Sequence, residues 1–369
     1  MNYELWIMDS PSNPTSPINK LKNLSMKIAV VILNWNGEQM LRDFLPSVVK
    51  HSHLPEALGE SAVYVADNGS TDGSLALLDA EFPTVRTIVL DRNYGFADGY
   101  NKAFETIDAE YAVLLNSDVE VTSGWLLSLV EYLDAHPQVA ACQPKLLAWH
   151  HKDEFEYAGA MGGFLDRYGY PYCRGRIFST VERDYGQYDA DVPLLWATGA
   201  CLAVRLATYK AVGGLDGRFF AHMEEIDLCW RLRCRGYEVR SVASSVVYHV
   251  GGATLNAGHP RKTFLNFRNN LLMLYKNLPS GELRRVLFVR GILDYVAAAT
   301  FLLKGEWGSM KAVFRARREF CQLKPQFRVS REENLRQAVS MDVPERTSFS
   351  ILWRYHLKGQ KTYDKVALK

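Results

Sequence analysis

Tyr111-Ala112-Val113-Leu114-Leu115-Asn116-Ser117-Asp118 is an apolar run that stops on a short polar tip ending in a carboxylate. Such a run predicts a fully buried strand of a parallel sheet, and open α/β sheets bind ligands at the carboxyl ends of these strands. Asp118 is therefore expected to face a site, where a carboxylate can hold a hard divalent cation. The alternative is that Asp118 caps the helix that begins at residues 122–126, since Asp is common at helix starts.

The composition indicates a soluble globular protein. The chain has 369 residues, 48% apolar and 23% charged, which suits one large domain or two ordinary ones. Its six cysteines lack zinc-ligand or redox spacing, which favours a reduced, cytoplasmic setting over a disulfide framework. Residues 1–25 are rich in Pro, Ser and Asn and show no signal peptide, so we expect a disordered extension, with Met26 as an alternative start.

Charge is distributed unevenly along the chain. Residues 280–369 carry 18 Lys/Arg against 9 Asp/Glu, whereas residues 1–279 carry 25 against 32. The basic end suits an anionic partner or is an ordinary solvated tail, and the acidic body argues against nucleic-acid binding.

Strands and helices alternate from Lys27 onward. Apolar strands are predicted at 28–33, 62–66, 86–90 and 111–115, with helices at 39–50 and 75–81 and another after the third strand. This alternation predicts a doubly wound, mostly parallel sheet flanked by helices. A polar cluster follows each strand, so the four clusters should converge on one crevice.

The polar clusters suit a nucleotide. Asp67 ends a buried strand, where its carboxylate can accept hydrogen bonds from a base or ribose, and Gly69 permits a tight turn into a helix N-terminus. Arg92 and Asn93 can meet a phosphate or base, while Gly95 lets the backbone come close. A plain turn with an Asx cap is the alternative for the cluster at Asp67.

Four motifs together carry a family resemblance: 33–37 (Leu-Asn-Trp-Asn-Gly), 67–74, 93–97 and 114–118. They resemble family 2 glycosyltransferases of the GT-A fold, in particular the rhamnosyltransferase-like branch, over roughly residues 27–277. The resemblance implies a Rossmann-like domain at 26–279 and inverting transfer of a sugar from a nucleotide-diphosphate donor. It also implies a set of nucleotide-binding residues: Asn34, Asn36, Asp67, Asn68, Arg92, Asn93, Gly95, Asn101, Asn116 and Ser117.

The resemblance extends to a metal and to diphosphate contacts. Residues 116–118 stand where many members carry Asp-x-Asp, and because the first position is Asn, metal binding falls mainly on Asp118. His249, at the end of a predicted strand, stands where a histidine completes the site for Mg²⁺ or Mn²⁺, although a structural histidine is the alternative. Arg261 and Arg268 on the following helix are expected to close over the donor's diphosphate.

The acceptor side is expected around residues 196–205. By resemblance Trp196, Gly199 and Ala200 contact the acceptor or sugar: the glycine lets backbone approach a substrate, and the tryptophan can stack on a ring. A core Trp beside a strand is the alternative for Trp196.

Inverting transfer needs a base and no enzyme nucleophile. The family carries Glu-Asp at the start of the helix near residue 224, followed two positions on by another Asp, and the second residue of the pair is the usual base. That role falls on Glu225, with Glu224 as the competing catalytic candidate. Asp227 can pair with Arg231 one turn later and is expected to be structural.

The region 280–369 is predicted to be basic and mainly helical. Residues 286–303 are apolar enough to suggest a membrane span, but Arg290 and Asp294 interrupt them and favour an amphipathic helix. That helix suits an anionic membrane surface, where a lipid-linked acceptor would lie. A helical appendage packed on the catalytic domain, or a homodimer contact, is the alternative.

These inferences predict a metal-dependent, inverting glycosyltransferase of cell-envelope polysaccharide synthesis, cytoplasmic or peripheral on the inner face of the membrane. It would move a sugar, with dTDP-rhamnose the first donor to try, to a glycan or lipid-linked acceptor. One alternative keeps the enzyme class with a UDP-hexose, UDP-N-acetylhexosamine or GDP-sugar donor. Another is a non-catalytic nucleotide- or glycan-binding module of the same fold.

Overall fold

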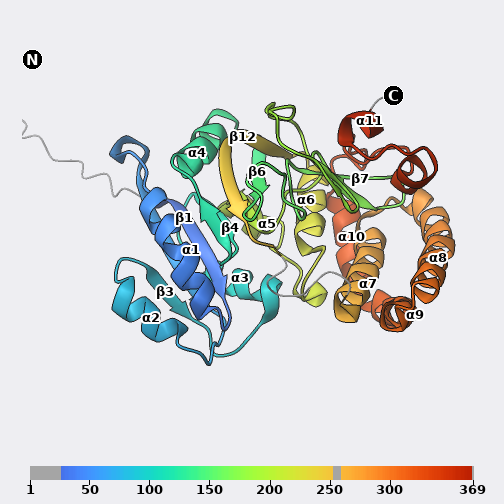
Figure 1. Cartoon of the computed structure of the whole chain (residues 1–369), viewed down its shortest axis with the longest axis horizontal. Coiled ribbons are helices and arrows are strands. Elements are labelled where there is room, and N and C mark those ends of the chain that lie inside the picture. The colour runs from blue at the N-terminus through green and yellow to red at the C-terminus, as the bar shows by residue number, and fades with distance from the viewer. Residues whose placement is uncertain (1–25, 252–258, 368–369) are drawn as a thin grey trace, which may run out of the picture.

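An eight-stranded sheet in the order β3-β2-β1-β4-β11-β6-β12-β5 forms the centre of the protein (Figure 1). The computed structural model describes residues 26–251 and 259–367, so the extension predicted at 1–25 lies outside the described part. The strands of the sheet are β1 (Met26–Asn34), β2 (Glu60–Asp67), β3 (Arg86–Val89), β4 (Tyr111–Leu115), β5 (Val119–Val121), β6 (Val139–Ala148), β11 (Cys201–Arg205) and β12 (Glu238–His249).

The first four strands are parallel, as the sequence predicts. β1 pairs with β2 on one side and β4 on the other, and β2 pairs with β3. Beyond β4 the sheet is mixed, because β11 runs antiparallel to both β4 and β6, and β5 antiparallel to β12. The prediction of a mostly parallel α/β sheet flanked by helices is confirmed.

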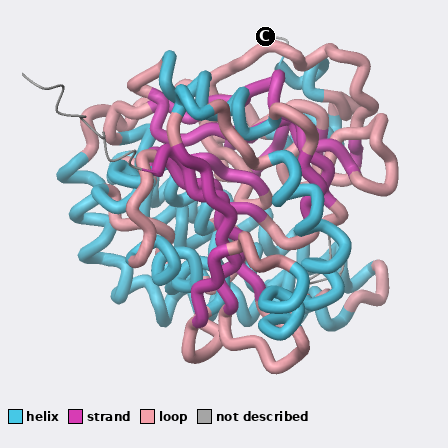
Figure 2. The backbone as a smooth tube through the Cα atoms, turned by 90° about the vertical axis from the view of Figure 1, so that its left-hand side faces the viewer, coloured by secondary structure: helices cyan, strands magenta, loops and turns pink. Residues whose placement is uncertain are grey.

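Helices cover both faces of the sheet, as the alternation along β1 shows. Ala29 and Val31 belong to a core cluster that includes residues of α3 (Gly95–Glu105), α5 (Leu206–Ala211), α6 (Glu224–Cys234) and α7 (Pro260–Asn277). Ile28, Val30 and Ile32 belong to a second cluster with residues of α1 (Glu38–His51), α2 (Ser74–Glu81) and α4 (Trp125–Ala135). The strands accordingly run through the middle of the molecule between helices (Figure 2).

Asp118 does not cap a helix. It is followed directly by the short strand β5, and α4 begins only at Trp125, after Gly124 in a left-handed conformation. The helix-cap alternative for Asp118 is therefore wrong.

A second sheet, ordered β10-β9-β8-β7, occupies the segment for which the sequence offers no motif. Its strands are β7 (Gly163–Leu165), β8 (Pro171–Cys173), β9 (Arg176–Ile177) and β10 (Thr180–Val181). The end of the chain packs against this sheet, since Leu165 bridges Arg346 and the Ile351 N–H donates to Asp166.

The C-terminal region is helical, as predicted, and forms one side of the molecule (Figure 1). Its main helices are α8 (Ser280–Leu303), α9 (Trp307–Leu323), α10 (Arg328–Gln337) and α11 (Tyr363–Ala367). Short helical turns complete the described secondary structure: η1 (Glu56–Leu58), η2 (Gly217–Phe219), η3 (Lys324–Phe327) and η4 (Trp353–Leu357).

α8 is long and apolar enough to cross a membrane, judged by length and composition alone. Arg290 and Asp294 do pair within it, at 3.3 Å, and both are fully buried against the protein. The opposite face carries exposed apolar side chains, including Phe288, Ile292 and Val296. The helix thus turns its ion pair inward and an apolar face outward.

Candidate active site

The ends of β1 and β2 meet in a buried polar cluster around Asp67. The Asn34 side-chain amide donates to Asp67 Oδ1 at 3.2 Å, and the Ser70 backbone N–H donates to Asp67 Oδ2 at 3.0 Å. Asn36, exposed at the rim, accepts from the Thr71 N–H at 2.7 Å. A carboxylate has about four acceptor sites, so Asp67 keeps capacity for a ligand after these two bonds.

Two loops pack together beside this cluster. Asn68 donates to the carbonyl of Gly95 at 3.0 Å and accepts from the Tyr94 N–H at 2.9 Å. Gly69 adopts φ +72°, and a Cβ there would lie 2.6 Å from the carbonyl carbon of Arg92, so only glycine fits. Asn93 is exposed next to them and accepts from the Gly95 N–H at 2.8 Å. The structure thus brings the predicted residues of β1, β2 and the β3–α3 loop to one edge.

Arg92 and Asn101 differ in what they can do. Arg92 is exposed, and its guanidinium lies 4.7 Å from the centre of the Tyr94 ring, which leaves it free to meet a ligand at the rim. Asn101 instead donates to the Leu215 carbonyl at 2.8 Å and accepts from the Tyr209 hydroxyl at 2.6 Å and the Leu215 N–H. The nucleotide-binding prediction for Asn101 is corrected, because its amide is used to hold the loop before η2.

Asp118 and His249 face each other at the ends of β4 and β12. His249 Nε2 lies 3.1 Å from Asp118 Oδ1 and 3.3 Å from the Asn116 amide nitrogen, while its Nδ1 lies 3.3 Å from Glu156 Oε1. Burial alone would lower the pKa of His249, but the carboxylates of Asp118 and Glu156 raise it to about 10. Burial alone would raise the pKa of Asp118, but the hydrogen bond and charge of His249 lower it below the usual value.

This arrangement fits a divalent cation. A metal-binding histidine usually gives its second nitrogen to a carboxylate, and Glu156 stands in that place relative to Asp118 and His249. Within residues 26–251 and 259–367 no group of three metal-ligating side chains is close enough to form a complete site. Mg²⁺ and similar ions are commonly held by one or two protein ligands, and water and phosphate oxygens fill the remaining coordination positions.

Glu156 is a site residue that sequence reasoning missed. It lies in the segment without motifs, and its second oxygen accepts from the N–H groups of Ala158 at 2.6 Å and Gly159 at 3.0 Å. Ser117, predicted to bind the nucleotide, lies beside the turn after β1, since a Cβ on Gly37 would lie 4.0 Å from the Ser117 hydroxyl oxygen.

The loop before α6 is strained and firmly held. Phe220, His222 and Met223 all have positive φ, which costs energy for residues other than glycine. The Asn269 side-chain amide on α7 donates to the carbonyls of Phe219, Ala221 and His222 at 2.9, 2.7 and 2.8 Å. The loop therefore presents the start of α6 in a fixed position.

Glu224 and Glu225 open α6 with side-chain oxygens that lack partners. One carboxylate oxygen of each is buried without a hydrogen bond. Burial raises the pKa of Glu225 to about 7, and burial together with the neighbouring Glu225 charge raises that of Glu224. A carboxylate with a pKa near 7 suits a general base, and buried unpartnered polar atoms of this kind are typical of functional sites.

Gly199 and Ala200 lie between Glu225 and the polar tip at residues 116–118. A Cβ on Gly199 would lie 3.9 Å from the Glu225 Cβ and 3.1 Å from the Phe96 ring, and the Ala200 carbonyl accepts from the Asn116 N–H at 2.9 Å. The segment predicted for the acceptor is thus beside Glu225.

Trp196 has a different role from the predicted one. It is 2% exposed, its indole N–H donates to the Phe164 carbonyl at 3.1 Å, and a Cβ on Gly163 would lie 1.9 Å from its ring. The ring fills the core and has no open face for a sugar, so the prediction for Trp196 is corrected.

The diphosphate-binding prediction for Arg268 is also corrected, whereas the guanidinium of Arg261 remains accessible to a ligand. Arg268 is buried and donates to Glu319 at 2.7 Å, to Asn269 and to the Phe219 carbonyl, so its donors hold the protein together. Arg261 is exposed, with its guanidinium 5.5 Å from the Phe220 ring centre.

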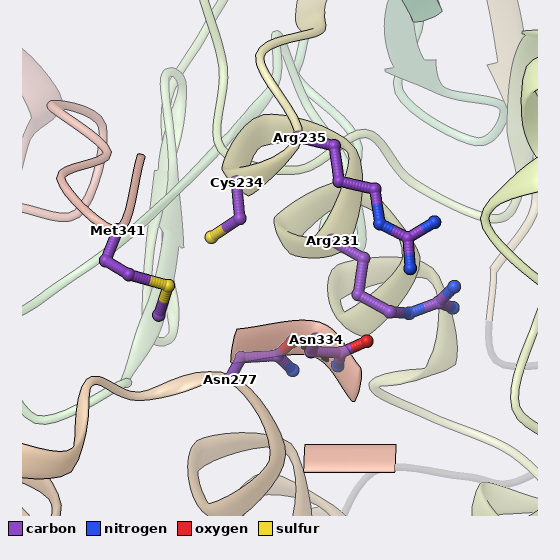
Figure 3. Close-up of a pocket in the computed structure, with 6 residues that line it drawn as sticks. All are labelled: Arg231, Cys234, Arg235, Asn277, Asn334 and Met341. Carbon is purple, nitrogen blue, oxygen red and sulfur yellow. Dashed lines mark hydrogen bonds between the residues drawn. The ribbon is translucent and has the colours of Figure 1, made fainter. Parts of the chain in front are cut away.

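Asp227 is structural, as predicted. It pairs with Arg231 at 2.9 Å and with Lys276 at 2.8 Å and accepts from Asn277 at 2.7 Å, which ties α6 to α7. Close to this network, six residues line a cavity of about 10 Å³, room for about one water: Arg231, Cys234, Arg235, Asn277, Asn334 and Met341 (Figure 3). It contains none of the site residues above.

Comparisons with known proteins relate the chain to glycosyltransferases. Residues 29–175 match the family described as glycosyl transferase family 2. The N-acetylglucosaminyl-diphospho-decaprenol L-rhamnosyltransferase of Mycobacterium tuberculosis is 27% identical over 240 residues, covering 60% of this chain and 75% of that protein. Rhamnosyltransferase WbbL of Escherichia coli is 23% identical over 194 residues, covering 50% and 70%.

Solved structures share the fold. S. aureus TarS 1–349 in complex with UDP-GlcNAc superposes with a TM-score of 0.54 at 15% identity, covering 85% of this chain and 89% of that one. GalNAc-T7 with UDP, GalNAc and Mn²⁺ gives a TM-score of 0.53 at 15% identity, covering 70% of this chain and 49% of that one. At this identity the likeness concerns the fold alone.

Proposed function

The chain is a rhamnosyltransferase-like glycosyltransferase of family 2 with a GT-A fold, and we propose that it transfers a sugar with inversion from a nucleotide-diphosphate donor. The acceptor is a lipid-linked sugar or glycan of cell-envelope polysaccharide synthesis. The observation that carries the proposal is the convergence of three groups at one sheet edge: the Asp67 cluster, the Asp118–His249 pair and Glu225.

The residues divide the reaction between them. Asp67, Asn68 and the loop at Gly95 bind the nucleoside, with Arg92 and Asn93 at the rim. Asp118 and His249 would hold a divalent cation, with Glu156 orienting the imidazole. A bound cation would supply positive charge beside the donor's diphosphate.

Glu225 is the base of a single displacement. The acceptor hydroxyl approaches past Gly199 and loses its proton to the Glu225 carboxylate as its oxygen bonds to the anomeric carbon. The bond from that carbon to the phosphate oxygen breaks on the opposite face, so the nucleoside diphosphate departs with the electron pair. Because the new bond forms on the face opposite the bond that breaks, the anomeric configuration is inverted.

The relatives suggest which donor to try first. Two of them are named as rhamnosyltransferases, which supports dTDP-rhamnose. TarS was solved with UDP-GlcNAc and GalNAc-T7 with UDP and Mn²⁺, which keeps a UDP-sugar donor as the second candidate and supports a divalent metal, Mg²⁺ or Mn²⁺. We disfavour a non-catalytic module because Asp118 and His249 lie 3.1 Å apart, in position to share a cation, and Glu225 keeps a buried carboxylate oxygen without a hydrogen-bond partner.

The outer face of α8 supports attachment to the cytoplasmic membrane surface. Phe288, Ile292, Val296 and Leu303 are 71, 53, 55 and 87% exposed along one stripe of the helix. Exposed Arg284, Arg285 and Lys304 stand at the two ends of that stripe. An exposed apolar stripe with cations at its ends suits the interface of an anionic bilayer, where a lipid-linked acceptor would lie.

The experiment is release of nucleoside diphosphate from dTDP-rhamnose, UDP-glucose, UDP-galactose, UDP-N-acetylglucosamine and GDP-mannose, with Mn²⁺, Mg²⁺ or EDTA. Turnover of one donor that requires metal supports the proposal and names the donor. Absence of both turnover and metal-dependent nucleotide binding across the panel would reject it.

A further inference from the structure

A groove of about 650 Å³ lies between α7 and α9, beside the strained loop that precedes α6. Its volume is within the usual range of small-molecule sites, about 300–1,000 Å³. The charged residues of its walls are five cations and one carboxylate: Arg218, Arg261, Arg268, Lys311, Arg315 and Glu319.

The positive charge of the groove is only partly compensated. Glu319 pairs with Arg268 at 2.7 Å and lies 3.9 Å from Arg315, and Arg218 pairs with Asp216. Arg261 and Lys311 have no carboxylate within ion-pair distance among the residues that the structure describes. A groove with this excess of positive charge suits a ligand with more than one negative charge.

The rest of the wall is apolar and holds the guanidinium groups in place. Phe220, Phe264 and Leu265 line the groove. The Arg315 guanidinium lies 4.6 Å from the centre of the Phe264 ring, and that of Arg261 lies 5.5 Å from the centre of the Phe220 ring. Cations stacked on aromatic faces keep their N–H donors available at the edge.

The groove reaches the active site through Phe220. A Cβ on Gly95, in the predicted nucleotide loop, would lie 3.1 Å from the Phe220 ring, and the Phe96 N–H donates to the Phe220 carbonyl at 3.3 Å. The base Glu225 follows in the same loop-to-helix connection. An anion in the groove would therefore lie next to both the donor and the base.

At its other side the groove meets an apolar surface. Trp307 and Phe314 flank Lys311 on α9 and are 59 and 49% exposed. The Phe314 ring lies 5.5 Å from that of Tyr295 on α8, which continues into the exposed apolar stripe of that helix. α8 forms the outer edge of this part of the molecule (Figure 1). Exposed cations and exposed aromatic side chains are thus neighbours on α9.

We propose that the groove binds the diphosphate of an isoprenoid-diphosphate-linked acceptor, with the isoprenoid chain passing over Phe314 and Tyr295 toward the outer face of α8. The inference rests on the proposed glycosyl transfer and names its acceptor class. It moves Arg261 from the donor's diphosphate, where the sequence predicts it, to the acceptor's.

The test is calorimetric titration of the full chain with farnesyl diphosphate, inorganic pyrophosphate and farnesol, and separately with nucleoside diphosphates in the presence of Mn²⁺. The variant is Lys311→Gln with Arg315→Gln, and the matched control is Arg318→Gln, an exposed cation of α9 outside the groove. We expect farnesyl diphosphate to bind more tightly than either fragment, and the double variant to weaken it about tenfold for each cation removed. The control should bind like the wild type, and nucleotide affinity should be unchanged in all three proteins.

The possible failures are distinguishable. If the double variant loses nucleoside diphosphate instead, the groove serves the donor and the inference is wrong. If Arg318→Gln loses as much farnesyl diphosphate affinity as the double variant, the effect comes from general surface charge. If pyrophosphate and farnesyl diphosphate bind equally tightly, the groove is a phosphate site without an isoprenoid path. Either result overturns the inference. Nucleotide binding without farnesyl diphosphate binding rejects this inference alone, whereas no nucleotide binding with any metal rejects the proposed function.

Discussion

The rate of sugar transfer is expected to follow the ionisation of Glu225. Burial raises the pKa of this carboxyl to about 7, and only the ionised form can accept the acceptor's proton. The carboxylate is therefore the minor species below that pH, and kcat/KM should fall about tenfold for each pH unit below the pKa. Between about pH 8 and about pH 6 the fraction ionised drops from roughly nine tenths to roughly one tenth, a predicted change of about ninefold.

Matched variants separate the two neighbouring glutamates. Glu225→Gln should lower kcat by about 10²–10⁴ and abolish the acidic limb, while Glu225→Asp should retain part of the rate. Glu224→Gln keeps the Glu225 carboxylate and should retain both the rate and the acidic limb. The readout is nucleoside diphosphate release with acceptor present, measured across pH with metal held saturating.

Stability gives an independent check on the same group. A carboxyl whose pKa is raised by folding binds its proton more tightly in the native state, so it destabilises the protein as pH rises from the ordinary glutamate range through about 7. Glu225→Gln removes that dependence and should be relatively more stable at neutral pH. A flat wild-type pH profile, or a fully active Glu225→Gln variant, would refute the assignment of the base.

Three further predictions concern other parts of the molecule. Glu156→Gln should weaken metal-dependent nucleotide binding about 10–100-fold without unfolding the protein, because Glu156 orients His249. Nucleotide titration at several Mn²⁺ concentrations tests this prediction, and an unchanged metal requirement would contradict it. Asp294→Ala leaves Arg290 buried without its partner and should lower the free energy of unfolding by about 3–5 kcal/mol, as measured by urea denaturation. The double variant Arg290→Met with Asp294→Leu removes both charges and should lose much less stability. Equal losses in the two proteins would contradict an ion-pair origin of the effect. Ile292→Asp with Val296→Asp should reduce sedimentation with anionic vesicles and leave donor hydrolysis intact, and unchanged vesicle binding would remove the membrane role from α8.

The early part of the fold is predictable from sequence because its signals are local. Apolar runs followed by polar turns mark β1, β2 and β4, and right-handed parallel connections then place Asn34, Asp67 and Asp118 at one edge. The antiparallel insertion of β11 between β4 and β6 has no local signal, since it depends on how a distant segment returns to the sheet.

The errors in the site have the same origin. Trp196, Asn101 and Arg268 have side chains suited to ligands, but each is occupied by a partner far away in sequence: Gly163, Leu215 and Glu319. Glu156 was missed because only its contact with His249 gives it a role.

α8 shows the limit of periodicity. The spacing of Arg290 and Asp294 predicts an amphipathic helix, but a pattern cannot say which face is turned outward. Arg317 and the carbonyl of Tyr168 complete the surroundings of the buried pair, and these contacts decide the orientation.

The most direct test of the account compares binding with chemistry in two variants, Asp118→Ala and Glu225→Gln. Each is titrated with the nucleoside diphosphate of the active donor plus Mn²⁺ and assayed for turnover. We predict that Asp118→Ala loses both binding and turnover, whereas Glu225→Gln binds the nucleotide like the wild type and turns over no donor. This assignment of roles would be contradicted if Glu225→Gln lost nucleotide binding as fully as Asp118→Ala, or if Asp118→Ala kept normal metal-dependent binding and turnover.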